Sequence, residues 1–343
     1  MAIKIAINGF GRIGRAAFKA ALQNKNLEVV GINDLMDNKT LTHLLKYDSV
    51  YGEYPKNVQG TKEGLKVDGK LYPVFEEKEP AKLPWQKLKV DVVLECTGRF
   101  TNKQEASAHL KAGAKKVIIS APAKDAVTQT LVLGTKETED CVKKGKCDAV
   151  ISMASCTTNC ISPVIQVLES KFGVEKALMT TVHSYTADQN LVDGPHKDLR
   201  RARAAAYNIV PTSTGAAIAT TKVVPTLENL FDGMAIRVPT ICGSISDITA
   251  VLKRKKVTVK QVNDEFKKAV KNPLFKNILA VTNKPVVSSD IVGTFYSAII
   301  DLELTKVIGG NLVKVFAWYD NEWAYSLRLA EMAEAVAKTI NQK

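Results

Sequence analysis

The stretch Asn8-Gly9-Phe10-Gly11-Arg12-Ile13-Gly14 decides the fold of the first part of the chain. It contains G-x-G-x-x-G directly after an apolar run at 3–7, and a helical pattern follows it as far as Leu22. Between a strand and a helix, such glycines let the backbone turn tightly and approach a pyrophosphate, whose charge the helix N–H groups and dipole stabilise. The motif therefore predicts a dinucleotide-binding turn; a glycine turn used only for packing is the alternative.

Short apolar runs alternate with helical patterns on both sides of this turn. The strands that we expect lie at 3–7, 27–32, 90–96, 117–120 and 149–153. Strands that alternate with helices form parallel βαβ units. We therefore expect an α/β fold with an N-terminal Rossmann dinucleotide-binding domain.

Asp34 follows the second of these strands, twenty positions after Gly14. A carboxylate at this place can accept hydrogen bonds from both ribose hydroxyls of the adenosine half of a dinucleotide. It would repel a 2′-phosphate, so NAD is favoured over NADP. Asp34 could instead be a turn residue or a helix N-cap.

The pattern changes in the second half of the chain. Alternating stretches at 174–182, 234–238, 246–252 and 296–304 are typical of a largely antiparallel sheet. The last segment, 322–343, places Leu329, Met332, Ala333, Val336 and Ile340 on one helical face. We expect a Rossmann domain at 1–155, to which the C-terminal helix 320–343 packs back, and an α+β catalytic and oligomerisation domain at 156–319.

Composition supports a folded protein of about two domains at ~150 residues each. The 343 residues are 45% hydrophobic and 24% charged, which argues against disorder and against a membrane fold. Three functions would explain the net charge of +13: binding to nucleic acid, binding to an anionic membrane, or catalysis on phosphorylated substrates. The basic residues form short scattered runs, which favours solvated faces, so we do not expect nucleic acid as the primary partner.

The N-terminus enters a strand pattern at once, without the apolar core of a secretory signal, so we expect the cytosol. The six cysteines show no paired C-x-x-C spacing, and we expect most of them to be reduced and structural, with no metal site.

Cys156 is the best candidate for a nucleophile. The strand at 149–153 leads into Ser155-Cys156-Thr157-Thr158-Asn159-Cys160 and then into a helical pattern. A thiol at a helix N-terminus has a lowered pKa because the dipole stabilises the thiolate. His183 ends the next strand and could activate this thiol and move protons, if it lies within reach. A buried small cysteine and a satisfied core histidine are the plain alternatives.

Several motifs together resemble phosphorylating glyceraldehyde-3-phosphate dehydrogenase, from one end of the chain to the other. The S-C-T-T-N-C box and the H-S-Y-T segment at 183–186 are the most specific. The remaining motifs are Asn8-Gly9-Phe10-Gly11-Arg12-Ile13-Gly14-Arg15, Ser213-Thr214-Gly215-Ala216-Ala217, Arg237-Val238-Pro239-Thr240 and Trp318-Tyr319-Asp320-Asn321-Glu322.

The resemblance implies a cytoplasmic, homotetrameric oxidoreductase of glycolysis and gluconeogenesis. It would convert D-glyceraldehyde 3-phosphate reversibly to 1,3-bisphosphoglycerate with NAD and inorganic phosphate. Cys156 would form a thiohemiacetal and then a thioester, with His183 as the acid–base group. Cofactor contacts would come from Gly9, Gly11, Arg12, Ile13, Gly14, Asp34, Lys78, Thr97, Gly98, Ser120 and Asn321.

The resemblance also places two anions near the thiol. Arg237 and Thr186, with Arg201 or Arg203 nearby, would hold the substrate phosphate, and Ser155, Thr157, Thr214 and Gly215 the inorganic phosphate. Each hydroxyl alone could equally be a helix cap or turn. Lys78 stands where many bacterial relatives carry Arg, and Gly194 where a larger apolar residue is frequent.

Two alternatives remain open at this point. A close relative would oxidise erythrose 4-phosphate with water as the acyl acceptor, and its activity would not require phosphate. A basic nucleic-acid-binding protein with a vestigial site would instead show steep salt dependence of RNA or DNA binding. Cys160, one helical turn after Cys156, either packs in the core or traps an oxidised Cys156.

Overall fold

A computed structural model describes residues 2–340, and these form two compact units. Among the described residues, the first unit comprises 2–131, 140–154 and 326–340, and the second 132–139 and 155–325. Within the described residues, none of the helices has the length and apolar character needed to span a membrane.

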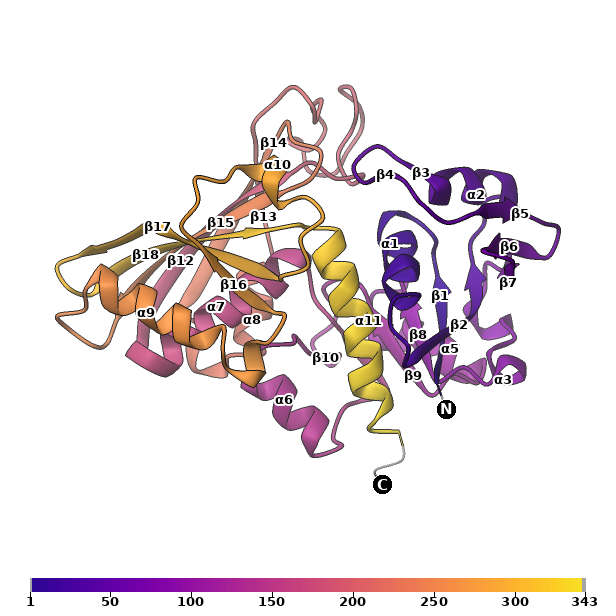
Figure 1. Ribbon diagram of the computed structural model, residues 1–343, viewed down its shortest axis with the longest axis horizontal. Coiled ribbons are helices and arrows are strands. Elements are labelled where there is room, and N and C mark those ends of the chain that lie inside the picture. The colour runs from indigo at the N-terminus through magenta and orange to yellow at the C-terminus, as the bar shows by residue number, and fades with distance from the viewer. Residues whose placement is uncertain (1, 341–343) are drawn as a thin grey trace. The chain divides into compact units, whose positions relative to one another are not determined.

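The first unit contains a nine-stranded sheet in the order β10-β11-β9-β8-β1-β2-β7-β6-β5 (Figure 1). The seven strands from β10 to β7 are parallel, and β6 and β5 extend the sheet in antiparallel fashion. The strands are β1 (Ile3–Asn8), β2 (Leu27–Asn33), β5 (Val58–Gly60), β6 (Gly64–Val67), β7 (Lys70–Phe75), β8 (Val92–Glu95), β9 (Lys116–Ile119), β10 (Gln129–Thr130) and β11 (Val150–Ser152).

The order of the strands confirms the Rossmann prediction. The central strands are buried apolar runs, as a parallel sheet covered on both faces requires. Helices connect them: α1 (Arg12–Ala21), α2 (Asn38–Lys46), α3 (Trp85–Leu88), α4 (Lys103–Ala106) and α5 (Ala108–Lys111), with a small ribbon of β3 (Tyr47–Asp48) and β4 (Gly52–Glu53). In the sheet, β1 lies between β2, which follows it along the chain, and β8. The strand order therefore reverses between β1 and β8, and in such sheets ligands bind at this point.

The second unit contains a seven-stranded sheet in the order β13-β14-β12-β15-β18-β17-β16. Its strands are β12 (Val174–Ser184), β13 (Val210–Ser213), β14 (Phe231–Val238), β15 (Ser244–Leu252), β16 (Leu279–Thr282), β17 (Ala298–Ile308) and β18 (Leu312–Tyr319). Only the β12–β14 and β16–β17 pairs are parallel, which confirms the expected mostly antiparallel sheet.

One face of this sheet carries α7 (Cys156–Phe172), α8 (Ala216–Thr221) and α9 (Val259–Ala269) (Figure 1). The short α10 (Ser288–Ile291) follows β16. On the sheet's other face, Leu178, Met234 and Leu312 remain 66%, 42% and 38% exposed. Leu178 and Leu312 line a shallow hollow of about 1090 Å³ over β12, β14, β15 and β18.

The C-terminal helix α11 spans Trp323–Ala337, shorter than expected, and residues 341–343 of the expected helix lie outside the described residues. Leu329, Met332, Ala333 and Val336 are fully buried, as predicted. Glu334 accepts hydrogen bonds from the side-chain amides of Asn24 and Asn26 at 2.9 and 3.0 Å. The helix from residue 326 onward therefore belongs to the first unit, although it closes the chain.

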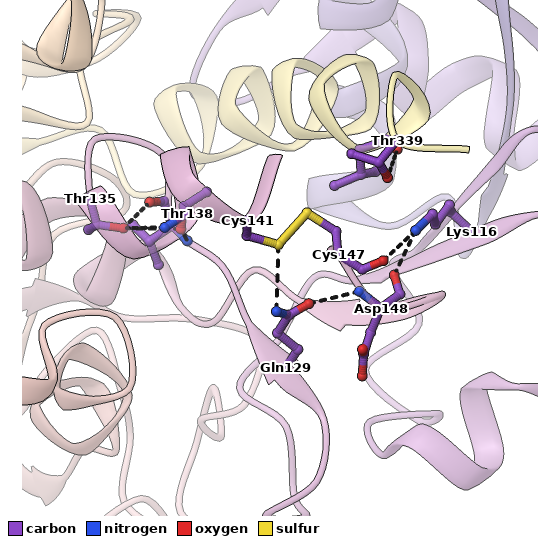
Figure 2. Close-up of a disulfide and its surroundings, with 10 residues drawn as sticks. Lys116, Gln129, Thr135, Thr138, Cys141, Cys147, Asp148 and Thr339 are labelled. Carbon is purple, nitrogen blue, oxygen red and sulfur yellow. Dashed lines mark hydrogen bonds between the residues drawn. A yellow bond between two sulfur atoms is a disulfide. The ribbon is translucent and has the colours of Figure 1, made fainter. Parts of the chain in front are cut away.

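Cys141, on α6 (Lys136–Lys143), is joined to Cys147 by a disulfide (Figure 2). Gln129 contacts the Cys141 sulfur and accepts the Asp148 N–H at 2.8 Å, and the buried Lys116 ammonium donates to the Cys147 carbonyl at 2.6 Å. The other four cysteines, at 96, 156, 160 and 242, are not disulfide-bonded. This agrees with the expectation that most of the cysteines are reduced. The sequence pattern did not predict the bridge between Cys141 and Cys147.

Candidate active site

Cys156 is the first residue of α7, as the strand-to-helix pattern predicted. Ser155 is the N-cap, and its hydroxyl accepts the Thr158 N–H at 3.1 Å. Such a cap stabilises the first turn of a helix by about 1 kcal/mol. The thiol is thus fixed at the amino end of a buried 17-residue helix.

His183 lies within hydrogen-bond reach of this thiol. Its Nε2 is 3.3 Å from the Cys156 sulfur, and its Nδ1 is 2.6 Å from the Ser184 carbonyl oxygen. With its proton on Nδ1, the imidazole donates to this carbonyl, which can only accept, and the Nε2 lone pair faces the thiol. The pair is therefore arranged for a proton to pass from sulfur to nitrogen.

Arg237 stands beside His183 because the two residues are paired in the parallel ladder between β12 and β14. One guanidinium nitrogen, Nη1, is 2.9 Å from His183 Nδ1 and donates to the Ser184 carbonyl at 3.1 Å. The same nitrogen is 3.5 Å from the Thr186 hydroxyl. The buried Nε has no hydrogen-bond partner, which leaves a cationic donor available for an anion.

The prediction of a lowered Cys156 pKa is wrong. Burial raises the pKa of this thiol, and the opposing Arg237 charge and contacts with Thr157 are smaller. Burial and then the Arg237 charge lower the pKa of His183 to about 3. The resting pair is a neutral thiol beside a neutral imidazole, because burial disfavours charge more than the helix terminus favours it.

Tyr319 is a site residue that the sequence did not single out, although it lies inside the quoted W-Y-D-N-E motif. Its ring packs edge-on against His183 at 5.9 Å between centroids. Its hydroxyl contacts the Thr157 hydroxyl at 3.0 Å and the Thr181 hydroxyl at 2.8 Å. Thr157 is buried and bonded to Tyr319, so its hydroxyl supports the site from within.

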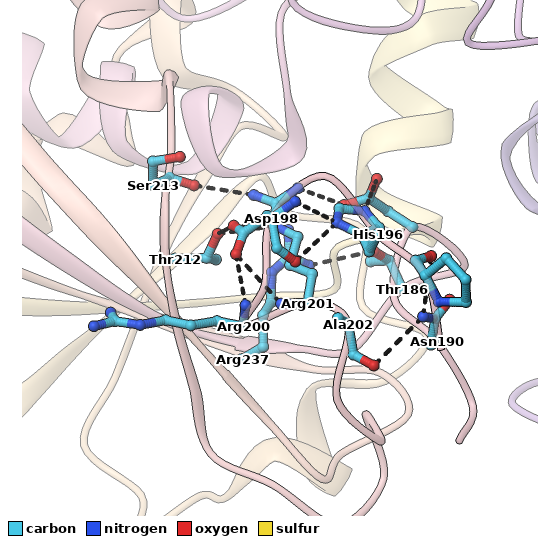
Figure 3. A network of polar contacts seen from close by, with 12 residues as sticks. Thr186, Asn190, His196, Asp198, Arg200, Arg201, Ala202, Thr212, Ser213 and Arg237 are labelled. Carbon is cyan, nitrogen blue, oxygen red and sulfur yellow. Dashed lines mark hydrogen bonds and ion pairs between the residues drawn. The ribbon is translucent and has the colours of Figure 1, made fainter. Parts of the chain in front are cut away.

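Arg201 takes part in a polar network on the segment between β12 and β14 (Figure 3). It pairs with Asp188, donates from Nε to the Thr212 hydroxyl at 2.8 Å and from Nη2 to the Ser213 carbonyl at 3.2 Å. Thr212 in turn donates to Asp198 at 2.9 Å. Burial lowers the pKa of Arg237, and the positive charge of Arg201 adds to this effect.

Arg203 is placed differently. Its side chain is 61% exposed and pairs with Asp193 at 2.7 Å. Of the two arginines between which the sequence could not choose, only Arg201 is linked to the strand that leads to Thr214. Thr214 is half-buried and accepts the Ala216 N–H, and Gly215 is exposed at the start of α8.

In the first unit, ten of the predicted cofactor residues follow the carboxyl ends of parallel strands. The first turn fits a dinucleotide: a Cβ on Gly14 would lie 2.0 Å from the Gly9 carbonyl oxygen, and one on Gly9 2.7 Å from the Thr97 nitrogen. Gly11 caps α1 without a side-chain hydrogen bond, so the cap residue itself leaves the N–H groups of the first helical turn uncovered. The ten residues are Gly9, Gly11, Arg12, Ile13, Gly14, Asp34, Lys78, Thr97, Gly98 and Ser120.

The side chains among these residues differ in what they already contact. Asp34 accepts the N–H groups of Phe10 at 2.6 Å and Met36 at 3.0 Å, so it shapes the turn, while Asp37 caps α2. The Arg12 guanidinium pairs with Asp48 at 2.9 Å. Lys78 is exposed.

Asn321 belongs to the second unit and is buried. Its Oδ1 accepts the Gly243 N–H at 3.1 Å and the hydroxyls of Ser184 and Ser244 at 2.9 and 3.0 Å. Because a backbone N–H can only donate, the Asn321 atom that faces Gly243 must be the amide oxygen. The Nδ2 group of Asn321 therefore points away from these three partners.

Cys160 is fully buried, and burial raises its pKa. Its sulfur lies 3.8 Å from the Ala317 carbonyl oxygen. These surroundings favour the packing interpretation over the oxidative one.

Comparison with known proteins agrees with this geometry. The family model for the NAD binding domain of glyceraldehyde 3-phosphate dehydrogenase matches residues 3–103, and that for its C-terminal domain matches 155–321. Glyceraldehyde-3-phosphate dehydrogenases from Thermotoga maritima and Priestia megaterium are 54% and 52% identical, each over 98% of this chain and 99% of their own. That from Geobacillus stearothermophilus is 51% identical over the same shares. The chain belongs to the glyceraldehyde 3-phosphate dehydrogenase family.

Proposed function

We propose that this chain oxidises D-glyceraldehyde 3-phosphate with NAD and inorganic phosphate through a thioester on Cys156. The observation that carries the proposal is the Cys156–His183 contact of 3.3 Å, next to a buried arginine with an unpartnered Nε. A nucleophile, a base and an anion-binding cation thus meet in one place.

The reaction would begin with attack of the Cys156 sulfur on the aldehyde carbon. The thiol proton passes through His183 Nε2 to the aldehyde oxygen, which gives a neutral thiohemiacetal. NAD, held by the first unit, would supply the hydride acceptor for this carbon. As the hydride leaves, His183 Nε2 takes the hydroxyl proton, and the product on Cys156 is a thioester beside an imidazolium.

Inorganic phosphate then attacks the thioester carbon. The carbon–sulfur bond breaks, the thiolate recovers a proton from His183, and the proton of hydrogen phosphate goes to solvent. One aldehyde, one NAD and one hydrogen phosphate therefore give one acyl phosphate, one NADH and one proton.

The low pKa of His183, about 3, depends in part on the positive charge of Arg237. A phosphate dianion on Arg237 would offset that charge and make His183 a better base once substrate is bound. Substrate binding would thereby be coupled to activation of the base.

We assign the substrate phosphate to Arg237 and Thr186, with Arg201 close by, and the attacking phosphate to Ser155, Thr157, Thr214 and Gly215. Arg237 is the strongest of these assignments because its buried Nε has no hydrogen-bond partner. Thr157 is the weakest, since its hydroxyl is engaged by Tyr319. The exposed Arg203, paired with Asp193, is left to a supporting role.

For the cofactor, we assign the pyrophosphate to the backbone of Gly9, Gly11, Arg12, Ile13 and Gly14. The ribose hydroxyls would bind Asp34, whose oxygens retain free lone pairs, and Lys78, Thr97, Gly98 and Ser120 would complete the pocket. Asn321 would donate from Nδ2 to the nicotinamide amide.

We further propose that the protein is a cytoplasmic homotetramer. The exposed leucines and Met234 on one face of the seven-stranded sheet support self-association, because antiparallel sheets bury apolar faces. The reaction needs a reduced Cys156 thiol, which a reducing compartment such as the cytoplasm maintains, whereas the Cys141–Cys147 disulfide is unusual for that compartment. Sedimentation of the protein, with Leu178→Asp as comparison, tests the assembly.

The test of the reaction is NADH formation from glyceraldehyde 3-phosphate, with and without inorganic phosphate, and with NADP in place of NAD. Phosphate-dependent reduction of NAD is the expected result. Reduction that proceeds equally without phosphate would make water the acyl acceptor and erythrose 4-phosphate the next substrate to try. A folded sample that reduces neither cofactor would refute the proposal.

A further inference from the structure

Three neighbouring strands of the first unit end in buried polar residues. Asn8, Asn33 and Glu95 are the last residues of β1, β2 and β8, and they are 1%, 5% and 1% exposed. They are also in register, because Asn8 is paired with Asn33 on one side and with Glu95 on the other. A line of buried polar groups therefore crosses the carboxyl edge of the sheet at its switch point.

Hydrogen bonds join these side chains into one chain. The Asn33 Nδ2 donates to the Asn8 Oδ1 at 2.7 Å, and the Asn8 Nδ2 donates to the Glu95 Oε2 at 2.5 Å. At one end, Asn33 bonds the backbone N–H and carbonyl of Glu77, each at 2.9 Å. At the other end, the Glu95 Oε1 accepts the N–H and the hydroxyl of Thr97.

His109 also contacts Glu95. The Trp85 indole N–H, which can only donate, lies 3.0 Å from the His109 Nδ1. The imidazole proton is therefore on Nε2, which lies 3.0 Å from the Glu95 Oε2. Both rings are completely buried, so this assignment does not depend on solvent.

The donors that reach Glu95 are an amide, an imidazole, a backbone N–H and a hydroxyl, and none of these groups carries a charge. Burying a carboxylate costs free energy, and here neutral donors must offset it. Apolar residues would stabilise the fold at least as well, so stability does not explain why a carboxylate occupies this position.

The network's position suggests what it does. It ties together the turns after β1, β2, β7 and β8, which carry Gly9, Asp34, Lys78 and Thr97. We propose that Glu95 and His109 are positioning residues for NAD: they hold the four turns in the geometry that binds the dinucleotide. This inference rests on the proposed function and adds a buried set of residues to it.

Glu95→Gln gives a sharp test because it keeps the size of the side chain. Whichever way the new amide is turned, its NH₂ group faces donors, either Asn8 and His109 or the N–H and hydroxyl of Thr97. We expect the Kd and KM for NAD to rise by about tenfold, the effect of one lost buried hydrogen bond. The kcat at saturating NAD should change by less than about threefold, since the Cys156–His183 pair lies in the other unit.

Trp85→Phe is a milder variant that removes only the donor to His109 and keeps an aromatic ring. Its Kd for NAD should rise by about threefold, less than that of Glu95→Gln. Lys116→Met is the matched control, because this buried ammonium lies at the amino end of β9, on the opposite edge of the same sheet. It should lower Tm without changing the Kd for NAD.

The measurements are Kd by fluorescence titration with NAD, Tm, and steady-state rates on the full chain. Unchanged NAD affinity in both Glu95→Gln and Trp85→Phe would overturn the inference, as would an equal loss in Lys116→Met at an equal drop in Tm. If the unaltered chain does not bind NAD, the proposed function fails first and this inference with it.

Discussion

Arg237→Gln separates the recognition of the substrate phosphate from the chemistry at Cys156. In the structure, the Arg237 Nε is buried and unpartnered, while Nη1 is engaged by the Ser184 carbonyl. The substitution keeps a polar side chain of intermediate length and removes the charge. It should therefore weaken binding of the phosphorylated aldehyde in particular.

The expected magnitude follows from the number of available donors. A hydrogen bond to a charged group contributes about 1.5–3 kcal/mol, and each 1.4 kcal/mol is about tenfold in rate or affinity. One bond from Nε to a phosphate oxygen is thus worth about 10- to 150-fold in kcat/KM. Loss of the Arg237 charge also lets the pKa of His183 rise from about 3, which offsets a part of the loss in transition-state stabilisation.

The assay compares kcat/KM for glyceraldehyde 3-phosphate with kcat/KM for glyceraldehyde, which lacks the phosphate. We expect a loss of about a hundredfold for the first substrate and less than about threefold for the second. Arg237→Lys, which keeps the charge but loses the planar fork, should fall between the two enzymes. Equal losses for both aldehydes would refute the reasoning, since Arg237 would then act on the Cys156–His183 pair alone.

Four further substitutions test the nucleophile, the base, the ribose contact and a contact of the C-terminal helix. Cys156→Ser should abolish thioester formation while NAD binding, measured by titration, stays unchanged; near-normal turnover would contradict the nucleophile assignment. His183→Asn should slow single-turnover hydride transfer by about 10²- to 10⁴-fold, which is the usual contribution of a general acid–base group to the rate. An unaltered rate would exclude His183 as that group. Asp34→Ala should raise KM for NAD more than KM for NADP, and unchanged discrimination between the cofactors would speak against the ribose assignment. Glu334→Gln should lower Tm at neutral pH. Hydrogen bonds from Asn24 lower the pKa of Glu334 below its ordinary 4.5, so the carboxylate stabilises the fold by up to about 1 kcal/mol, and this stabilisation is lost as the pH falls through the lowered pKa. A Tm difference between the two proteins that persists below that pKa would show that the charge of Glu334 is not its cause.

Local patterns in the sequence were enough to predict the two turns on which the function rests. Gly9 and Gly14 mark the first because no side chain fits there, and Ser155 and Cys156 mark the second because a cap precedes a helical repeat. The parallel sheet, the mostly antiparallel sheet and the C-terminal helix follow from the same kind of short-range periodicity.

Other features depend on residues that only the fold brings together. The contact of Tyr319 with His183 joins strands β18 and β12, and the pairing of Arg201 with Asp188 lies within a segment of little regular structure. The raised pKa of Cys156 follows from its burial among distant segments, which a helix-terminus argument does not include. The buried line of Asn8, Asn33 and Glu95 requires the strand order and register.

The pairing of His183 with Arg237 in one strand ladder also bears on how this protein can vary. Between these residues the chain leaves β12, runs through the segment 185–209 and the elements after it, and returns along β14. The spacing of the base and the cation is set by backbone hydrogen bonds of the ladder, not by that excursion. Apart from Thr186, Arg201 and Arg203, which are assigned to the substrate phosphate, residues in 185–209 can therefore be replaced, inserted or deleted while the spacing of His183 and Arg237 stays fixed.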